Sequence, residues 1–201
     1  MRGLRAGVLA VAVAVAAFAA GCGGGERQDE GAPEGTFDVD VTEASFPAEQ
    51  AIASPAVLSL EVANGSDRAV PDLAVTVETL GAAEGEAPAA FGQRTGDPSL
   101  ADSSRPVWIV DEPPAGGQSA YTNTWTLGEL APGERRTIQW TVTPVRPGDF
   151  TLGYRLSPSV VGDAAIEGED TAGEFEVSIS NDPVPAKVNG KGEVVREEPG
   201  R

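Results

Sequence analysis

The chain has 201 residues, with 14 Lys and Arg against 31 Asp and Glu, no His, and a formal net charge of -17 at pH 7. This acidity argues against nucleic-acid binding, because affinity for a phosphate backbone depends on basic side chains that neutralise phosphates. The single Cys excludes an intrachain disulfide, and the length suits one domain of ordinary size with tails.

The first 21 residues have the order of a secretory signal. Arg2 and Arg5 form a basic start, an uncharged stretch rich in Ala and Val follows over 6–20, and small residues precede Cys22. As a helix, this stretch would reach about 22 Å, which is shorter than the roughly 30 Å hydrocarbon core of a bilayer. We therefore predict a cleaved signal peptide over 1–21 and not a permanent spanning helix.

The run Ala19-Ala20-Gly21-Cys22 resembles the lipobox of bacterial lipoproteins, although Ala19 stands where Leu is commonest. The resemblance implies cleavage before Cys22, diacylglycerol on its thiol, and acylation, for example with palmitate, of the new amino terminus. It places the chain on the extracytoplasmic face of a cell membrane, with the membrane as its covalently linked partner. The alternative is an ordinary secretory signal that is cut elsewhere. Residues 22–35 are rich in Gly and acid, which predicts a flexible acidic tether.

Seven segments of the following region alternate apolar and polar residues, as strands with one buried face do. They are 37–41, 58–62, 73–77, 121–127, 138–142, 150–156 and 175–179. Gly, Pro, Asn and Asp separate several of them, as expected for turns. The pattern predicts an all-β chain with a single immunoglobulin-like antiparallel β-sandwich of about seven strands over 36–180. The parity of Trp125 and Trp140 predicts that both are buried.

Two stretches carry a second resemblance. Residues 57–64 end in Asn64 before Gly65, and residues 127–142 contain Leu130-Ala131-Pro132-Gly133. Both resemble bacterial immunoglobulin-like domains of the cell-adhesion-related (CARDB-like) and conserved-repeat types. The resemblance implies that a strand ending in Asn-Gly leads to a paired strand, and that a Leu-x-Pro-Gly turn leads into the next hairpin. These motifs mark turns and fold, not chemistry.

An insertion over 81–120 interrupts the regular strands, and loops of this length in compact domains are usually functional, partly ordered or disordered. The run 105–114 is too apolar to stay in water, so we expect it to lie on the sandwich as a short strand. Trp108 has two interpretations. It is either the plug that holds the insertion to the sandwich or, together with Arg105, part of an exposed partner-binding surface.

Residues with obvious catalytic chemistry are scarce. Without His, the usual general base and metal ligand is missing, and no glycine motif for nucleotide binding is present. The acidic run Glu167, Glu169 and Asp170 is a weak candidate for a calcium site, and the alternative is a solvated loop. No cofactor is expected. A carboxylate-dependent hydrolase is a third, weaker hypothesis.

Residues 181–201 form a C-terminal tail that either frays or makes a small hairpin around Asn189-Gly190. Taken together, the sequence predicts a membrane-anchored extracytoplasmic lipoprotein that carries an immunoglobulin-like interaction or envelope-structural module, without catalysis and with an envelope protein as its expected partner. The alternative is an accessory lipoprotein that binds a ligand or cation through residues 81–120 or 167–170.

Overall fold

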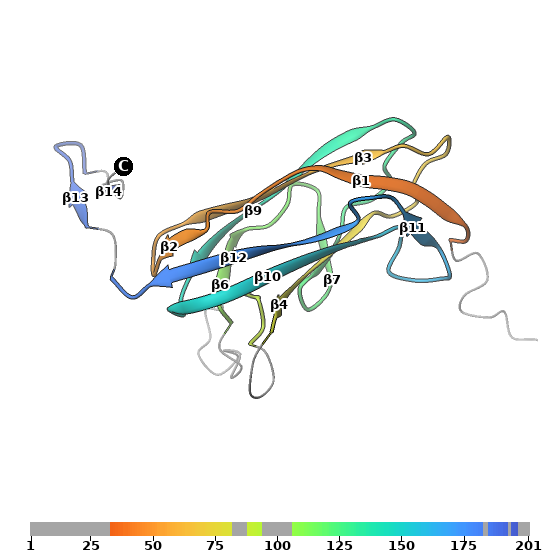
Figure 1. The fold of residues 1–201 in the computed structure, drawn as a ribbon. Helices are drawn as coiled ribbons and strands as arrows, with labels where there is room; N and C mark the ends of the chain where they lie inside the picture. Colours follow the sequence, from red (N-terminus) through yellow and green to blue (C-terminus); the bar gives the residue numbers. More distant parts are fainter. Residues whose placement is uncertain (1–32, 82–87, 94–105, 183–184, 193, 197–201) are drawn as a thin grey trace, which may run out of the picture. The chain divides into compact units, whose positions relative to one another are not determined.

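The computed structural model describes residues 33–81, 88–93, 106–182, 185–192 and 194–196. Within these ranges the chain is all-β and contains no helix. Two six-stranded sheets face each other, and a separate two-stranded hairpin follows them along the chain (Figure 1). The predicted fold class, a β-sandwich, is confirmed. The predicted signal peptide and nearly all of the predicted tether lie outside the described residues.

The first sheet contains the first strand of the sandwich, and most neighbouring strands in this sheet are antiparallel. In spatial order its strands are β11 (Ala165–Glu167), β1 (Thr36–Ser45), β3 (Ala56–Asn64), β9 (Arg135–Pro144), β6 (Trp108–Glu112) and β5 (Phe91–Gln93).

The second sheet is built around two long strands that pair with each other in antiparallel register, and a third strand pairs with the other edge of one of them. In spatial order its strands are β2 (Glu49–Ala51), β12 (Ala172–Ser180), β10 (Gly148–Ser157), β4 (Ala74–Leu80), β8 (Thr124–Thr126) and β7 (Gln118–Tyr121).

The core lies between the sheets and follows the alternation of the strands. In β3, every second residue from Ala56 to Asn64 is buried, and the intervening residues are exposed or half-buried. The same alternation covers the second half of β9, from Ile138 to Pro144. Because a strand turns successive side chains to opposite faces, each sheet contributes one apolar face. The result is one continuous apolar core between the two layers.

The first strand changes sheets. β1 pairs with β3 in the first sheet, the chain crosses at Phe46, and β2 joins β12 in the second sheet. Since β1 and β2 run in one direction and β12 is parallel to β2, the chain enters the sandwich at one end and leaves it at the other (Figure 1).

The insertion contributes more strands than its sequence suggested. The expected short strand is present as β6, which pairs with β9, and β5 lies outside it in the same sheet. β7 joins the opposite sheet beside β8. The described part of the insertion therefore supplies edge strands to both layers. The structure therefore has more strands than the seven predicted from alternation. Most of the additional strands are only three to five residues long.

The described residues of the tail form a small hairpin, which is one of the two alternatives that the sequence left open. β13 (Ala186–Val188) pairs with β14 (Val194–Arg196) in antiparallel register, so that Val188 is opposite Val194. No helix among the described residues is long and apolar enough to cross a membrane, and the apolar stretch 6–20 is not among them.

Candidate functional site

Two residues singled out from the sequence, Cys22 and Arg105, lie outside the described residues. Their predicted roles stay predictions. Along the chain, β1 starts at Thr36, which follows Cys22 by 14 positions. The intervening chain spans at most about 50 Å when fully extended. A lipid on Cys22 would therefore keep the start of β1 within about 50 Å of a membrane surface.

Trp108 is fully buried, so the expectation that it forms part of an exposed partner surface is wrong. Its Nε1–H donates to Gln50 Oε1 at 2.8 Å. Its ring makes edge contacts with Phe46, Phe91 and Phe150, at centroid distances of 5.6, 6.2 and 6.0 Å. The indole is thus both buried and hydrogen-bonded. Trp108 holds the insertion to the core, which was the other interpretation of this residue.

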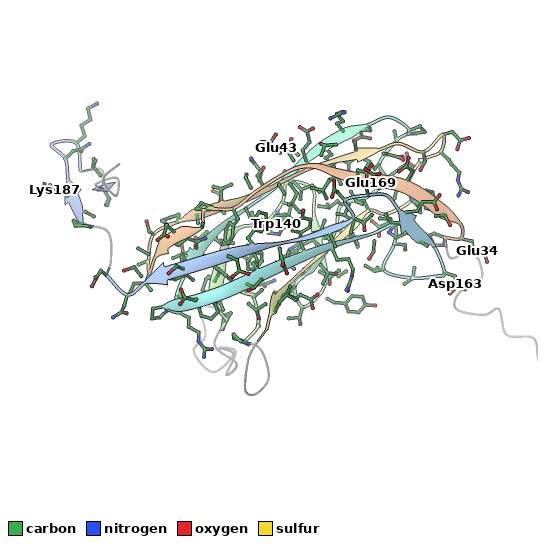
Figure 2. All side chains as sticks on the ribbon, in the orientation of Figure 1. Glu34, Glu43, Trp140, Asp163, Glu169 and Lys187 are labelled. Atoms are coloured by element: carbon green, nitrogen blue, oxygen red, sulfur yellow. The ribbon has the colours of Figure 1, made fainter. Side chains whose placement is uncertain are left out.

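The remaining two tryptophans are in the core, as their parity predicted. Trp125 and Trp140 are 4% and 0% exposed, and Trp140 lies between the sheets (Figure 2). Their rings meet edge to face at 5.6 Å, a favourable arrangement for aromatic pairs. Within the described part of the chain, Trp140 Nε1–H has no hydrogen-bond acceptor. Phe91 links this pair to Trp108, so aromatic rings run continuously through the core.

The acidic loop lies against the first strand. Glu167 is the register partner of Asp38, and the backbone N–H of Asp170 donates to Asp40 Oδ1 at 3.2 Å. The backbone N–H of Val41 in turn donates to the Asp170 carbonyl at 2.8 Å. A Cβ on Gly168 would lie only 2.6 Å from the Val39 carbonyl oxygen, so this close approach requires glycine.

This loop belongs to the end of the sandwich at which β1 begins, where Figure 2 also shows Glu34, Asp163 and Glu169. Glu167, Glu169 and Asp170 are all exposed. Among the described residues, no group of three or more His, Cys, Asp or Glu side chains is placed to hold a metal ion. The loop is an exposed acidic turn that backbone hydrogen bonds fasten to β1.

The two motifs behind the immunoglobulin-like resemblance meet in one buried corner. Asn64 is 1% exposed, and its Nδ2 donates to the carbonyls of Arg68, Leu130 and Ala131 at 3.0, 2.9 and 3.1 Å. Its Oδ1 accepts from the Ser66 backbone N–H at 2.9 Å. One amide side chain thus joins the turn after β3 to the turn before β9. We call this group, Asn64 with its four backbone partners, the Asn64 corner.

The turn before β9 is braced a second time by charge. Glu134 accepts from the Ala131 backbone N–H at 2.8 Å and from the Arg136 guanidinium at 2.6 Å. The Ala131 N–H, followed by Arg136, lowers the pKa of the Glu134 carboxyl below its ordinary value of 4.5. Arg136 also donates to the carbonyls of Leu127 and Glu129. The charged groups of this turn therefore serve its structure.

Tyr121 is the exposed aromatic residue that the sequence pattern missed. Its parity with Trp125 predicted burial, yet it is 62% exposed. The reason is Asn123, which adopts a φ of 60° and turns the chain between β7 and β8. All four residues of β7 are exposed at the edge of the second sheet. An Asn inside an alternating run was the available signal, because Asn tolerates the left-handed conformation. We call β7 with Tyr121 the Tyr121 edge.

No family model matches this chain, and no curated protein matches it. Among solved structures, it is similar to the CARDB domain of a Pyrococcus furiosus protein in complex with di-metal ions, with 16% identity, a TM-score of 0.42, and coverage of 72% of this chain and 89% of that one. It is also similar to part of Escherichia coli alpha-2-macroglobulin, with 17% identity, a TM-score of 0.42, and coverage of 73% of this chain and 17% of that one. Red sea bream transglutaminase matches with 13% identity, a TM-score of 0.38, and coverage of 75% and 16%. These likenesses concern the fold alone.

Proposed function

We propose that this protein is a lipid-anchored extracytoplasmic lipoprotein whose β-sandwich is an interaction or envelope-structural module without catalysis. The observation that carries the proposal is the position of Cys22. It is the only Cys of the chain, and it directly follows an apolar stretch that ends in small residues. Two or three acyl chains hold a protein stably at a membrane, whereas a single chain does not.

Several polar side chains of the sandwich make hydrogen bonds that hold the fold, and this supports the proposal that the module is not catalytic. Trp108 and Asn64 are buried, and their hydrogen bonds to Gln50 and to the Leu130 carbonyl hold the fold. Glu134 and Arg136 brace a turn, and Thr151 donates to Glu176 across the β10–β12 pair. The Tyr121 edge supplies the best candidate contact surface, since exposed aromatic residues are enriched where proteins bind one another.

The anchor is tested by expressing the full chain and a Cys22→Ser variant in a bacterial host that is fed a palmitate analogue suitable for chemical labelling. We expect the unaltered chain to be labelled and to sediment with membranes. The variant should lose the label and leave the membrane fraction. A labelled Cys22→Ser variant, or an unlabelled wild-type chain in a host that labels another lipoprotein, would overturn the anchor.

The contact surface is tested separately, in intact cells, with a photoreactive amino acid at position 121. We expect covalent adducts to an envelope protein at this position. The matched control carries the same group at Ser178, which is exposed on β12 in the same sheet. Deleting residues 81–120 would be a poor substitute, because it would remove β6 and Trp108 from the fold. Equal adduct patterns at positions 121 and 178 would contradict a specific surface at the Tyr121 edge.

A further inference from the structure

The chain contains two Asn-Gly pairs, Asn64-Gly65 and Asn189-Gly190. Such a pair can modify itself. The backbone nitrogen of the Gly attacks Cγ of the Asn side chain, a new C–N bond closes a five-membered succinimide ring, and Nδ2 leaves as ammonia with the displaced proton. Water then opens the ring at either carbonyl and yields Asp or isoaspartate. The net change consumes one water, releases one ammonia and needs no oxidant or enzyme.

The fold blocks this reaction at the first pair. Asn64 Nδ2, the leaving group, donates to three carbonyls in the Asn64 corner. The attacking nitrogen of Gly65 donates to the Asp38 carbonyl at 2.8 Å. The backbone of Asn64 is itself held by hydrogen bonds to Glu134 and Gly133. Attack would require these bonds to break together, which means opening the Asn64 corner and the end of β3.

The second pair is in a different setting. Gly190 is exposed in the turn between β13 and β14, and a Cβ built on it would meet nothing within 4 Å. Each of the two strands is only three residues long. Isolated two-stranded hairpins are marginally stable in water, so this turn opens without disturbing the sandwich. The turn bonds that Asn189 accepts include those from the Lys191 and Gly192 N–H groups, and they open with the turn.

We propose that Asn189 is a site of spontaneous deamidation, while Asn64 is protected by the fold. The product places a carboxylate beside Lys191 and changes the formal side-chain charge of the tail, residues 181–201, from balanced to negative. Residues 181–201 carry four basic and four acidic side chains, which are Lys187, Lys191, Arg196 and Arg201 against Asp182, Glu193, Glu197 and Glu198. The isoaspartate product also adds a methylene group to the backbone of the turn. The hairpin is therefore the part of this chain whose charge and geometry change with the age of the molecule.

The test compares the two pairs within one molecule. The full chain is incubated in mildly alkaline buffer at physiological temperature, digested at acidic pH, and scored by mass spectrometry for the mass gain of the amide-to-acid change. We expect conversion at Asn189 to exceed conversion at Asn64 by about a hundredfold or more, because opening β3 requires most of the global unfolding free energy. In denaturant, the two pairs should react at similar rates.

A Gly190→Ala variant separates the chemistry from the setting. Its added methyl group hinders attack by the backbone nitrogen but meets no neighbour, so conversion at position 189 should slow severalfold with the thermal midpoint unchanged. Similar conversion at Asn64 and Asn189 in the native chain would overturn the proposal. Absence of conversion at Asn189 in the native chain, together with reaction in denaturant, would overturn it as well, because the hairpin would then be protective.

Discussion

Asn64 is the residue on which two separate turns depend. Its amide is almost completely buried and reaches backbone groups from the turn after β3 and from the turn before β9. A buried polar group that loses its partner keeps its desolvation cost, which is about 1 to 3 kcal/mol. Removing one side chain therefore affects two loops that are 66 residues apart in sequence.

We predict that Asn64→Ala lowers the free energy of unfolding by about 1 to 3 kcal/mol, because the Arg68 carbonyl and the Ser66 N–H lose the amide that pairs them. Urea unfolding followed by tryptophan fluorescence measures this change. Asn181→Ala, at an exposed position, is the matched control and should stay within about 0.5 kcal/mol of the unaltered chain. An Asn64→Ala midpoint equal to that of the control would contradict the role of the Asn64 corner.

Tyr154 is a second single residue that gives a testable prediction, because the ionisation of its phenol makes stability depend on pH. Burial, followed by the negative charge of Asp170, raises the pKa of its phenol above the ordinary 10.0. Because the folded value exceeds the unfolded value, its contribution to stability is complete below about pH 10 and is lost as pH rises through the folded pKa. The chain has two tyrosines, so Tyr121→Phe leaves Tyr154 as the only titrating phenol.

We expect ultraviolet titration of the Tyr121→Phe variant to show a midpoint above 10, which moves to the ordinary value in denaturant. An Asp170→Asn variant should lower the native midpoint, since one cause of the shift is removed. A native midpoint equal to the denatured one would contradict the environment that the structure gives Tyr154.

Among the secondary-structure elements, the long strands could be predicted from the sequence and the short ones could not. Long strands with a strict period of two, such as β3 and β9, were predicted because each buries one face against the other sheet. The short strands were not, since three residues are too few to establish a period. The segment 121–127 was misassigned because alternation continues across Asn123, where the backbone turns.

The candidate site was less readable than the fold. Burial of Trp108 depends on Phe46 and Gln50, which are more than 50 residues away in sequence, and no local pattern reports such contacts. Exposure of Tyr121 depends on a single turn residue. By contrast, the prediction for Cys22 depends only on its immediate neighbours in the sequence, which is why it could be made without a fold.

At the scale of elements, we predict that Trp108 fastens β6 and the insertion to the sandwich. Trp108→Ala should lower the free energy of unfolding by about 3 to 5 kcal/mol, because it opens a cavity and removes the donor to Gln50 Oε1. Trp108→Phe keeps a ring but loses the N–H donor, so its cost should be smaller. Tyr121→Ala, at an exposed position on β7 in the opposite sheet, should change stability by no more than about 0.5 kcal/mol.

Thermal unfolding and urea unfolding of these three variants provide the measurement. If Trp108→Ala proved no more harmful than Tyr121→Ala, the insertion would not be held by the indole, and the packing described for β6 would be contradicted.

The whole molecule is dominated by its negative charge. With a formal charge of -17, the folded chain repels itself. The ion pairs among the described residues include strongly exposed ones such as Arg155–Glu78. Exposed pairs contribute little to stability. Salt screens charges beyond about 8 Å at physiological ionic strength. Screening should therefore remove more repulsion than attraction.

We predict that raising sodium chloride from a few millimolar to about 0.15 M increases the thermal midpoint by about 2 to 4 °C, which corresponds to about 1 kcal/mol for a domain of this size. Scanning calorimetry measures the change, and an equal osmolarity of a neutral sugar controls for effects other than screening. A midpoint that falls with salt would show that favourable ion pairs outweigh the net repulsion.

The chain enters the sandwich at one end and leaves it at the other, and this determines how the fold responds to mechanical force. Tension applied between Thr36 and Ser180 acts along the strands, because the chain enters at one end and leaves at the other. The parallel strands β2 and β12 pair from Glu49 opposite Ser178 to Ala51 opposite Ser180. The hydrogen bonds of this pair are perpendicular to the applied force, so the force shears them. Hydrogen bonds that are stretched sideways in this way must break together, whereas those of a hairpin pulled open break one at a time. Under tension, the lifetime of the sandwich would therefore depend on the rate at which this short pair shears apart.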